Sequence, residues 1–358
     1  MAALPMPPQP ILDSLRHGVV IPAHPLALTP ERRLDERHQR ALTRYYCASG
    51  AGGLAVAVHT TQFEIREPGF ALMEPVLSLA AEEARAYALA TGREVALIAG
   101  ICGRTDQALR EAEMATRLGY HAGLLSLAAL KGADTDELIA HCRDVSRVIP
   151  LFGFYLQPAV GGRLLDCAFW RRFAEIENVV GIKMAPFNRY QTLDVVRGVA
   201  ESGRAGEVAL YTGNDDHILL DLLTPFEVVA NGAQVSLRIV GGLLGQWAVW
   251  TSKAVAVLEE AHAIAGTGSP VPLELLAVAN QLTEANAAIF DVAHNYAGCI
   301  CGINEVLRRQ GLLASNACLG ERESLSPGQA EEISRVSAAY AYLTDDAFVA
   351  ENLAGWLV

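Results

Sequence analysis

The sequence predicts an α/β fold, a (β/α)8 TIM barrel followed by a C-terminal helical extension. Short, nearly continuous apolar runs alternate with stretches of helical periodicity, a pattern typical of a parallel sheet covered by helices. Eight such units occupy about 240 residues, the number and size of a TIM barrel. A doubly wound sheet would usually carry a glycine-rich phosphate turn after its first strand, and here the chain reads Pro22-Ala23-His24-Pro25.

Each of the first predicted strands is followed by a helical segment, several with a capping signal at their start. The eight strands are expected at residues 19–21, 54–58, 95–99, 123–127, 149–155, 179–183, 208–211 and 228–235. Thr29 before a proline, Thr105, Asp134 in a capping-box pattern and Asp166 mark predicted helix starts. The predicted strands and helices therefore form successive strand–helix units along the chain.

Three regions follow from this pattern. Residues 1–15 contain four prolines in their first ten positions and are expected to form a loose or disordered tail. Residues 16–239 form the predicted barrel, and we expect any catalytic site to lie in it, since barrels of this kind carry their active sites at the strand ends. Residues 240–358 show only helical periodicity, with helices expected at about 240–265, 271–295, 297–310 and 327–355.

Net charge, apolar runs and cysteine usage limit the kinds of partner and compartment that we expect for this protein. The net charge of -12 argues against nucleic acid and anionic membrane surfaces, which reward clustered Lys and Arg. No apolar run reaches the roughly 18 residues that span a bilayer, and the N-terminus lacks the features of a signal peptide. The seven cysteines are odd in number and scattered, which indicates reduced, buried thiols. We therefore expect a cytoplasmic protein.

Lys183 stands out because the chain has only three lysines, at 131, 183 and 253, against 25 arginines. It ends the sixth predicted strand, and polar residues at strand ends form the active sites of such barrels. A desolvated lysine can lose its proton and attack a carbonyl to form an imine, which arginine cannot do. The structural alternative is a lysine that reaches water at the end of a strand.

Polar residues also end other strands. His59, Thr60 and Thr61 follow the second strand, and Tyr155 closes the fifth, next to the strand that carries Lys183. A phenol beside an amine can carry protons between the carbinolamine and the imine. The alternatives are that Tyr155 is a core aromatic residue whose hydroxyl is satisfied locally, and that His59 is structural.

These motifs resemble those of the dihydrodipicolinate synthase and N-acetylneuraminate lyase superfamily, the class I pyruvate-dependent lyases. Residues 181–183 (Gly-Ile-Lys) resemble its Schiff-base strand, and residues 155–158 (Tyr-Leu-Gln-Pro) resemble its Tyr-Asn-x-Pro segment. Residues 60–61 match its paired threonines, and residues 213–215 (Gly-Asn-Asp) resemble its Gly-Asp-Asp turn. The four motifs occur in the family's order and on the expected strands, and the C-terminal helices match its usual extension.

The resemblance implies a role for each matched residue. Lys183 forms the imine with a 2-oxo acid, typically pyruvate, and Tyr155 relays protons. Thr60 and Thr61 hold the carboxylate, with Thr60 counted among the catalytic residues. Further substrate contacts are expected from residues at or near strand ends: His59, Gln157, Asn214 and Val235.

Three departures bear on the substrate. The family's Gly-Thr-Thr-Gly-Glu reads His-Thr-Thr-Gln-Phe over residues 59–63, and residues 126–130 lack the tyrosine pair of the synthases. Val160 stands where the synthase carries its substrate-binding arginine, although Arg163 or Arg189 remains a candidate replacement. These departures disfavour lysine-pathway synthase activity and predict a second substrate that is less anionic.

The predicted function is a Schiff-base lyase, an aldolase or hydratase-aldolase, that acts on a 2-oxo acid such as pyruvate or its aldol adduct. The imine on Lys183 needs no cofactor, and the nine histidines show no HxH or HExxH spacing for a metal. A homotetramer or homodimer is expected from the family. The missing tyrosine pair, one member of which reaches a neighbouring subunit's site in the synthases, predicts that each site here is built from one subunit. The alternative is a catalytically silent barrel that binds a 2-oxo or sugar acid as a sensor or structural partner.

Overall fold

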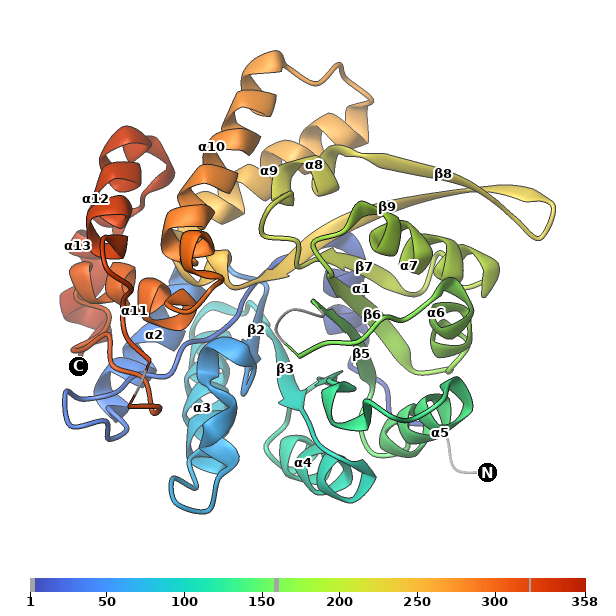
Figure 1. The fold of residues 1–358 in the computed structure, drawn as a ribbon, viewed down its shortest axis with the longest axis horizontal. Coiled ribbons are helices and arrows are strands. Elements are labelled where there is room, and N and C mark those ends of the chain that lie inside the picture. The colour runs from blue at the N-terminus through green and yellow to red at the C-terminus, as the bar shows by residue number, and fades with distance from the viewer. Residues whose placement is uncertain (1–3, 158–160, 322) are drawn as a thin grey trace.

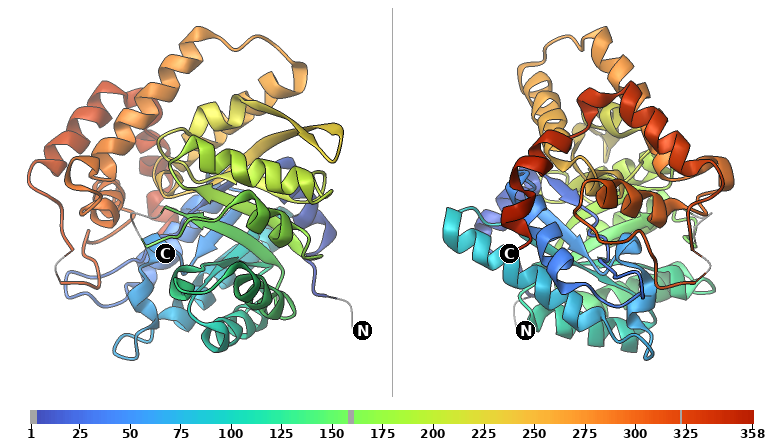
Figure 2. Two further views of the ribbon diagram at one scale, coloured as in Figure 1. Left: turned by 45° about the vertical axis from the view of Figure 1, so that its right-hand side comes forward. Right: turned by 90° about the vertical axis from the view of Figure 1, so that its left-hand side faces the viewer.

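Eight parallel strands ring a closed barrel in the computed structural model, with helices around its outside and a layer of C-terminal helices on one side (Figure 1, Figure 2). The structure describes residues 4–157, 161–321 and 323–358. Pro158 and Val160, which entered the comparison with the family's motifs, lie outside the described residues. The predicted fold class is confirmed.

The barrel strands follow one another around the ring in the order β1-β9-β7-β6-β5-β4-β3-β2. Their bounds are β1 (Val20–Pro22), β2 (Gly53–Val56), β3 (Ala96–Ile101), β4 (Ala122–Leu125), β5 (Leu151–Leu156), β6 (Val179–Ala185), β7 (Ala209–Thr212) and β9 (Ala233–Leu244). The ring closes where Ala23 bridges Ala55 in parallel and the His24 N–H donates to the Ala55 carbonyl at 2.8 Å.

The helices that cover the barrel pack against the outer faces of these strands. They are α2 (Glu36–Ala48), α3 (Met73–Thr91), α4 (Thr105–Arg117), α5 (Thr135–Ser146), α6 (Cys167–Ala174), α7 (Arg189–Glu201) and α8 (Ile218–Leu223). Asp134 caps α5 in a capping box with Glu137, and Asp166 caps α6, as predicted. The first of them begins later than expected, because Asp35 and not Thr29 accepts the N-cap hydrogen bond of α2.

The prediction of a loose tail over residues 1–15 is wrong from residue 9 onward. Helix α1 (Gln9–His17) begins directly after Pro8 and buries Ile11, Leu12 and Leu15. These three side chains belong to the same cluster as the residues that line the barrel interior. The helix therefore closes one end of the barrel, and burial of its apolar face outweighs the proline-rich composition.

The predicted eighth strand is also wrong. Residues 228–235 span a hairpin in which β8 (Pro225–Ala230) runs antiparallel to the first half of β9, and the long pair projects from the barrel (Figure 1). Asn231 and Gly232 form its tip with φ of 51° and 80°, the left-handed pair that a two-residue hairpin turn requires. The true eighth barrel strand is the second half of β9, which pairs with β7 and β1 up to Leu244. The barrel accordingly runs past the expected boundary at 239.

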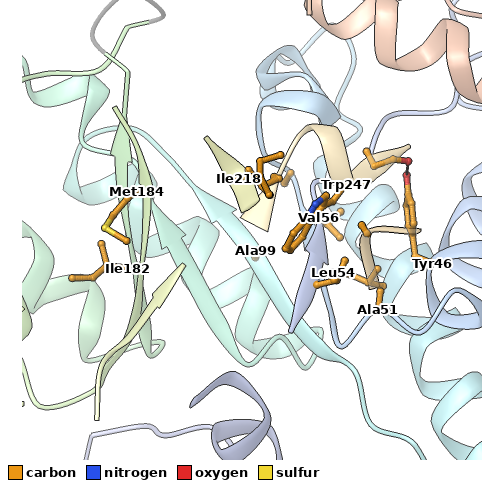
Figure 3. Packing of buried hydrophobic residues seen from close by; sticks show 14 of the residues in the cluster. Tyr46, Ala51, Leu54, Val56, Ala99, Ile182, Met184, Ile218 and Trp247 are labelled. Carbon is orange, nitrogen blue, oxygen red and sulfur yellow. Dashed lines mark hydrogen bonds between the residues drawn. The ribbon is translucent and has the colours of Figure 1, made fainter. Parts of the chain in front are cut away.

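Two hydrophobic cores lie on opposite faces of the strands. The inner core fills the barrel and includes Phe154 of β5, whereas Tyr155 belongs to the outer core between strands and helices. Ile182 and Met184 of β6 also lie in the outer core (Figure 3), so that Lys183 between them faces inward. This alternation of inward and outward side chains decides which residues of each strand face the barrel interior.

The C-terminal region consists of α9 (Thr251–Thr267), α10 (Leu273–Ile289), α11 (Cys299–Arg309), α12 (Gln329–Ala339) and α13 (Asp346–Trp356). Buried Asp345 joins it to the barrel, because its carboxylate accepts hydrogen bonds from Tyr45 of α2 at 2.8 Å and from the Ser252 N–H at 3.2 Å. The Leu319 N–H donates to Gln62 just after β2, at 2.6 Å. Within the described residues, no helix combines the length and apolarity needed to cross a membrane.

Candidate active site

A pocket lies where strands β2, β5, β6 and β7 end, and the C-terminal region closes its other side. The barrel contributes the predicted residues His59, Thr60, Gln157 and Lys183 to its wall. Its volume is about 160 Å³. On this measure a cavity needs about 10–15 Å³ to hold one water molecule, so the pocket has room for a small organic molecule.

Lys183 projects from β6 into this pocket and is only 9% exposed. Its stem packs against Gly213, where an added Cβ would lie 2.6 Å from the lysine Cε. Its amine lies 4.7 Å from the centre of the Phe154 ring. Burial is the main effect that lowers the pKa of Lys183, to about 8, while the negative charge of Asp215 acts in the opposite direction. A substantial fraction of the amine is therefore neutral near pH 8.

Asp215 faces the same pocket from the turn after β7. Its Oδ1 accepts a hydrogen bond from the Gln246 N–H at 3.2 Å, and its backbone carbonyl accepts one from Asn286 at 2.6 Å. Burial raises the pKa of Asp215 to about 7, against the opposing effect of the Lys183 charge. The sequence prediction named Asn214 from this turn, although the acidic residue that follows it was the available signal.

Asn214 is buried and supports the pocket from behind. Its Oδ1 accepts a hydrogen bond from the Phe187 N–H at 3.1 Å, and its Nδ2 donates to Asp221 at 3.0 Å. Phe187 has a φ of 51°, which side-chain-bearing residues rarely adopt, and its ring lines the pocket. Asn214 is not among the residues that line the pocket, and the structure gives its amide a supporting position that holds Phe187 in place.

Tyr155 points away from the pocket. In the register of β5 and β6, Phe154 pairs with Lys183 and Tyr155 pairs with Met184, so Tyr155 lies on the outer face. Its ring centre is 5.3 Å from that of Trp170, and its hydroxyl accepts a hydrogen bond from the Leu165 N–H at 3.2 Å. This placement does not support the proton-relay prediction, and it fits the alternative of a core aromatic residue whose hydroxyl is satisfied locally.

The two threonines fix the turn after β2, η1 (His59–Thr61). Thr60 donates its hydroxyl proton to the Ala23 carbonyl at 2.8 Å, and Thr61 donates to the His24 carbonyl at 2.6 Å. Thr60 lines the pocket, whereas Thr61 is fully buried behind it. Direct substrate contact therefore remains a prediction for Thr60, and the structure gives Thr61 a supporting position.

His59 sits in the mouth of the pocket, where its side chain is exposed. Desolvation by the surrounding chain and then the positive charge of Lys183 lower the pKa of His59. The imidazole is neutral at neutral pH and free to accept or donate one hydrogen bond.

The C-terminal region forms the wall opposite the strands and was not predicted to contribute. Its lining residues are Phe290, Asn295, Tyr296, Cys299 and Ile303. The Tyr296 ring lies 6.2 Å from that of Phe187. The side chain of Gln157 acts on the Tyr296 hydroxyl and lowers its pKa, against the larger effect of burial. No sequence pattern at a strand end marks this loop. Its contribution to the pocket becomes visible only in the tertiary structure, where segments distant in sequence pack together.

Val235 is far from the pocket. It pairs with Val228 in the projecting hairpin, nine positions along β9 from Leu244 at the pocket end of the strand. At about 3.3 Å per residue, that separation is roughly 30 Å. Its assignment as a substrate contact is wrong because the eighth strand was placed too early.

The candidate arginines are engaged elsewhere. Arg163 donates to the backbone carbonyls of Leu130 at 2.6 Å and Ala133 at 2.9 Å. Arg189 pairs with buried Asp221 at 2.6 Å. Among the described residues that line the pocket, none is an arginine. In the same described part of the chain, no three His, Cys, Asp or Glu side chains gather where they would hold a metal ion.

No protein-family model matches the chain, and no curated protein matches it. Solved structures do resemble it. Dihydrodipicolinate synthase from Oceanobacillus iheyensis superposes with a TM-score of 0.73 at 15% identity, covering 93% of this chain and 99% of that one. N-acetylneuraminate lyase from Fusobacterium nucleatum gives a TM-score of 0.70 at 16% identity, covering 91% and 99%.

A third match is a prophage protein of the dihydrodipicolinic acid synthase family from E. coli K12, solved in complex with pyruvate. Its TM-score is 0.68 at 16% identity, covering 90% of this chain and 97% of that chain. The fold of the chain is therefore that of the dihydrodipicolinate synthase and N-acetylneuraminate lyase structures, a TIM barrel with a helical extension, along nearly their whole length.

Proposed function

We propose that the chain is a divergent member of the dihydrodipicolinate synthase and N-acetylneuraminate lyase superfamily, and that it is a Schiff-base lyase acting on a 2-oxo acid such as pyruvate. The observation that carries this proposal is Lys183, a buried amine with a lowered pKa at the carboxyl end of the sixth barrel strand. Barrels of this kind carry their catalytic residues at that end of the strands.

The chemistry starts from the neutral amine of Lys183. It attacks the 2-oxo carbon, and loss of water from the carbinolamine leaves a protonated imine. The imine withdraws electrons from the neighbouring methyl carbon and so stabilises the enamine, which forms or breaks a carbon–carbon bond. Asp215 is the described acid whose charge acts on Lys183, and it is suited to exchange protons with the amine during these steps.

The 2-oxo acid would bind with its carboxylate toward Thr60 and the turn after β2. Thr60 lines the pocket, and its hydroxyl oxygen keeps lone pairs for a water or ligand proton while its own proton goes to Ala23. The lining has no arginine among its described residues, which favours a second substrate without a further carboxylate.

Trapping with borohydride tests the proposal. Pyruvate with borohydride should add one covalent adduct on the peptide that contains Lys183, and Lys183→Ala should abolish it. The chain offers a matched control, because Lys131→Arg/Lys253→Arg removes both other lysines and should leave the adduct unchanged. No adduct with any 2-oxo acid, or an adduct that survives in Lys183→Ala, would refute the proposal.

A silent binding barrel is the second candidate, and one observation favours it. The neighbour of Lys183 on β5 is Phe154, so no phenol of that strand faces the amine. Such a protein would bind pyruvate in calorimetry without forming the reducible imine. The trapping experiment therefore separates the two candidates.

We also propose that the protein is a homotetramer or homodimer with each pocket built within one subunit. Strand-end residues and the loop that carries Tyr296 together line the pocket within one subunit, and the tyrosine pair that the synthases exchange between subunits is missing from residues 126–130. Sedimentation at micromolar concentration should give a mass of two or four times 38.3 kDa. A monomer alone would contradict the proposal.

A further inference from the structure

We propose that Tyr296, on the loop between α10 and α11, is the proton donor for the second substrate, a carbonyl compound with an apolar body. The inference rests on the proposed imine chemistry and adds to it a catalytic residue and a substrate class. Tyr296 of the C-terminal region would take the proton-transfer role that the sequence predicted for Tyr155 on β5, whose phenol does not face the pocket.

The barrel side of the pocket has no phenol in the described residues of its wall. Phe154 occupies the inward position beside Lys183, and Tyr155 is turned outward with its hydroxyl used by Leu165. Tyr211, the other tyrosine of the inner core, donates its hydroxyl to the Leu15 carbonyl at 2.8 Å, near helix α1. Both of these hydroxyls are already engaged away from the pocket.

Tyr296 does reach the pocket. It lines the same pocket as Lys183, together with Phe290, and its ring lies 6.2 Å from that of Phe187. The side chain of Gln157, on the strand side, acts on the Tyr296 hydroxyl. Burial, with smaller contributions from the charges of Asp216 and Asp215, raises the pKa of Tyr296. The phenol therefore stays protonated at neutral pH and keeps a proton to donate.

The loop holds Tyr296 in an uncommon backbone conformation. Asp291, Asn295 and Tyr296 have φ of 57°, 54° and 66°, which side-chain-bearing residues rarely adopt. Such residues cluster at functional sites, where the surrounding structure enforces them.

Two buried side chains enforce the loop conformation. The carboxylate of Asp291 accepts hydrogen bonds from the Gly298 N–H at 2.9 Å and from the Ser326 hydroxyl, and it pairs with His294 at 2.6 Å. Gln329 donates to the carbonyls of Gly298 at 3.0 Å and Ile289 at 3.1 Å. The loop is fixed on both sides of Tyr296, so the phenol is held in a defined place.

The proposed reaction starts from the imine between pyruvate and Lys183. The methyl group of the pyruvate imine loses a proton to the carboxylate of Asp215, and the enamine carbon attacks the aldehyde carbon. A carbon–carbon bond forms, the carbonyl π bond breaks, and its oxygen takes the proton of Tyr296. The phenolate regains a proton from Asp215, whose charge already acts on the phenol, and water then hydrolyses the imine to free Lys183.

The surroundings of Tyr296 define the substrate class. Phe187, Phe290 and Ile303 line the pocket beside it, and Leu156 adds a further apolar side chain. An apolar body, flat enough to lie against aromatic rings, would displace water from these surfaces. A carboxylate there would lose its hydration without a described arginine to replace it. We therefore assign neutral aldehydes, aromatic ones included, as the second substrate.

The experiment compares Tyr296→Phe with Tyr155→Phe, its matched control outside the pocket. Each variant is tested for borohydride trapping of pyruvate and for condensation of pyruvate with benzaldehyde, butyraldehyde and aspartate semialdehyde. In Tyr296→Phe the adduct should form as in the natural protein while condensation with the neutral aldehydes falls about 10²–10⁴-fold, the scale of a positioned acid. Tyr155→Phe should change neither readout by more than about twofold.

The outcomes are distinct. The inference is overturned if the Tyr296→Phe variant condenses pyruvate with the neutral aldehydes at the rate of the natural protein. It is also overturned if the natural protein forms the adduct but condenses pyruvate with none of the three aldehydes, or prefers the semialdehyde. An unaltered protein that forms no adduct refutes the proposed function and the inference with it. If Tyr296→Phe unfolds, fluorotyrosine at position 296 keeps the hydroxyl with a lower pKa, and the alkaline limb of the condensation rate should move to lower pH. An unmoved limb overturns the assignment.

Discussion

Strands β5 and β6 lie side by side, and each ends in a residue with the chemistry expected of an imine-forming site, yet only one of these residues reaches the pocket. On β6, Lys183 faces inward between the outward side chains Ile182 and Met184. On β5, the inward position belongs to Phe154, and Tyr155 packs outside the barrel. The comparison shows that the position of a residue along a strand does not by itself predict that it reaches the pocket, because the residue must also lie on the inner face of the barrel.

The inner face of β6 should matter for chemistry and little for stability. Lys183→Met keeps the length of the side chain and removes the nucleophile, so turnover should fall by roughly 10⁴-fold or more. The thermal midpoint should stay the same or rise, because burial already disfavours the charged amine. Turnover assays and calorimetry check the two parts. A protein that retains turnover would show that Lys183 is not the nucleophile.

The outer face of the same strand should give the opposite result. Met184 is fully buried in the outer core, so Met184→Ala should lower the free energy of unfolding by about 2–5 kcal/mol through lost contacts and a cavity. Borohydride trapping per folded molecule should be unchanged. Denaturant unfolding gives the first quantity. A stability change below about 0.5 kcal/mol would mean that the two faces of β6 are less distinct than the structure shows.

The pH dependence of imine formation should report Lys183. Only the neutral amine attacks, and its pKa is lowered to about 8, so the rate of trapping with pyruvate should rise as the pH increases through about 8 and level off above it. The negative charge of Asp215 raises the pKa of Lys183, so Asp215→Asn should move this rise to lower pH. Trapping rates across a pH series measure the shift. A rise that stays in place would show that Asp215 does not act on the amine.

The outward tyrosine should give the smallest effect. Tyr155→Phe leaves the Leu165 N–H without its partner, which costs about 1–3 kcal/mol of stability. Turnover should stay within about twofold, because the hydroxyl has no access to the pocket. Chemical denaturation and steady-state kinetics measure the two quantities. A large loss of turnover at unchanged stability would restore Tyr155 as a proton relay.

Much of the fold was predictable, because local patterns suffice for it. Seven of the eight strands and the helices between them follow from apolar runs and capping residues such as Asp134 and Asp166. The two errors, in the eighth strand and in the N-terminal tail, each correspond to a sequence signal that was available. Asn231-Gly232 is a hairpin turn that divides the predicted eighth strand, and the apolar spacing of Ile11, Leu12 and Leu15 marks a helix despite the prolines around it.

The candidate site was only half predictable. Lys183, Thr60, His59 and Gln157 do come together, since all of them lie at the carboxyl ends of parallel strands in one barrel. Asn214 and Thr61 sit behind the pocket wall, where their polar groups are used by the backbone of neighbouring segments. Residue type and strand position cannot distinguish a side chain that faces a pocket from one that supports it.

By itself, the sequence determined a parallel barrel with a helical extension and placed its one strand-end lysine at the rim. Apolar alternation and composition are local properties, and burial translates them directly into this architecture. Only the tertiary structure decided which face each residue takes. Leu151 pairs with Val179 and Phe152 with Gly181, so Val180 is an extra residue that changes the alternation of β6 relative to β5. Long-range packing likewise brings Tyr296 to the pocket, since loops distant in sequence meet only when the cores have formed.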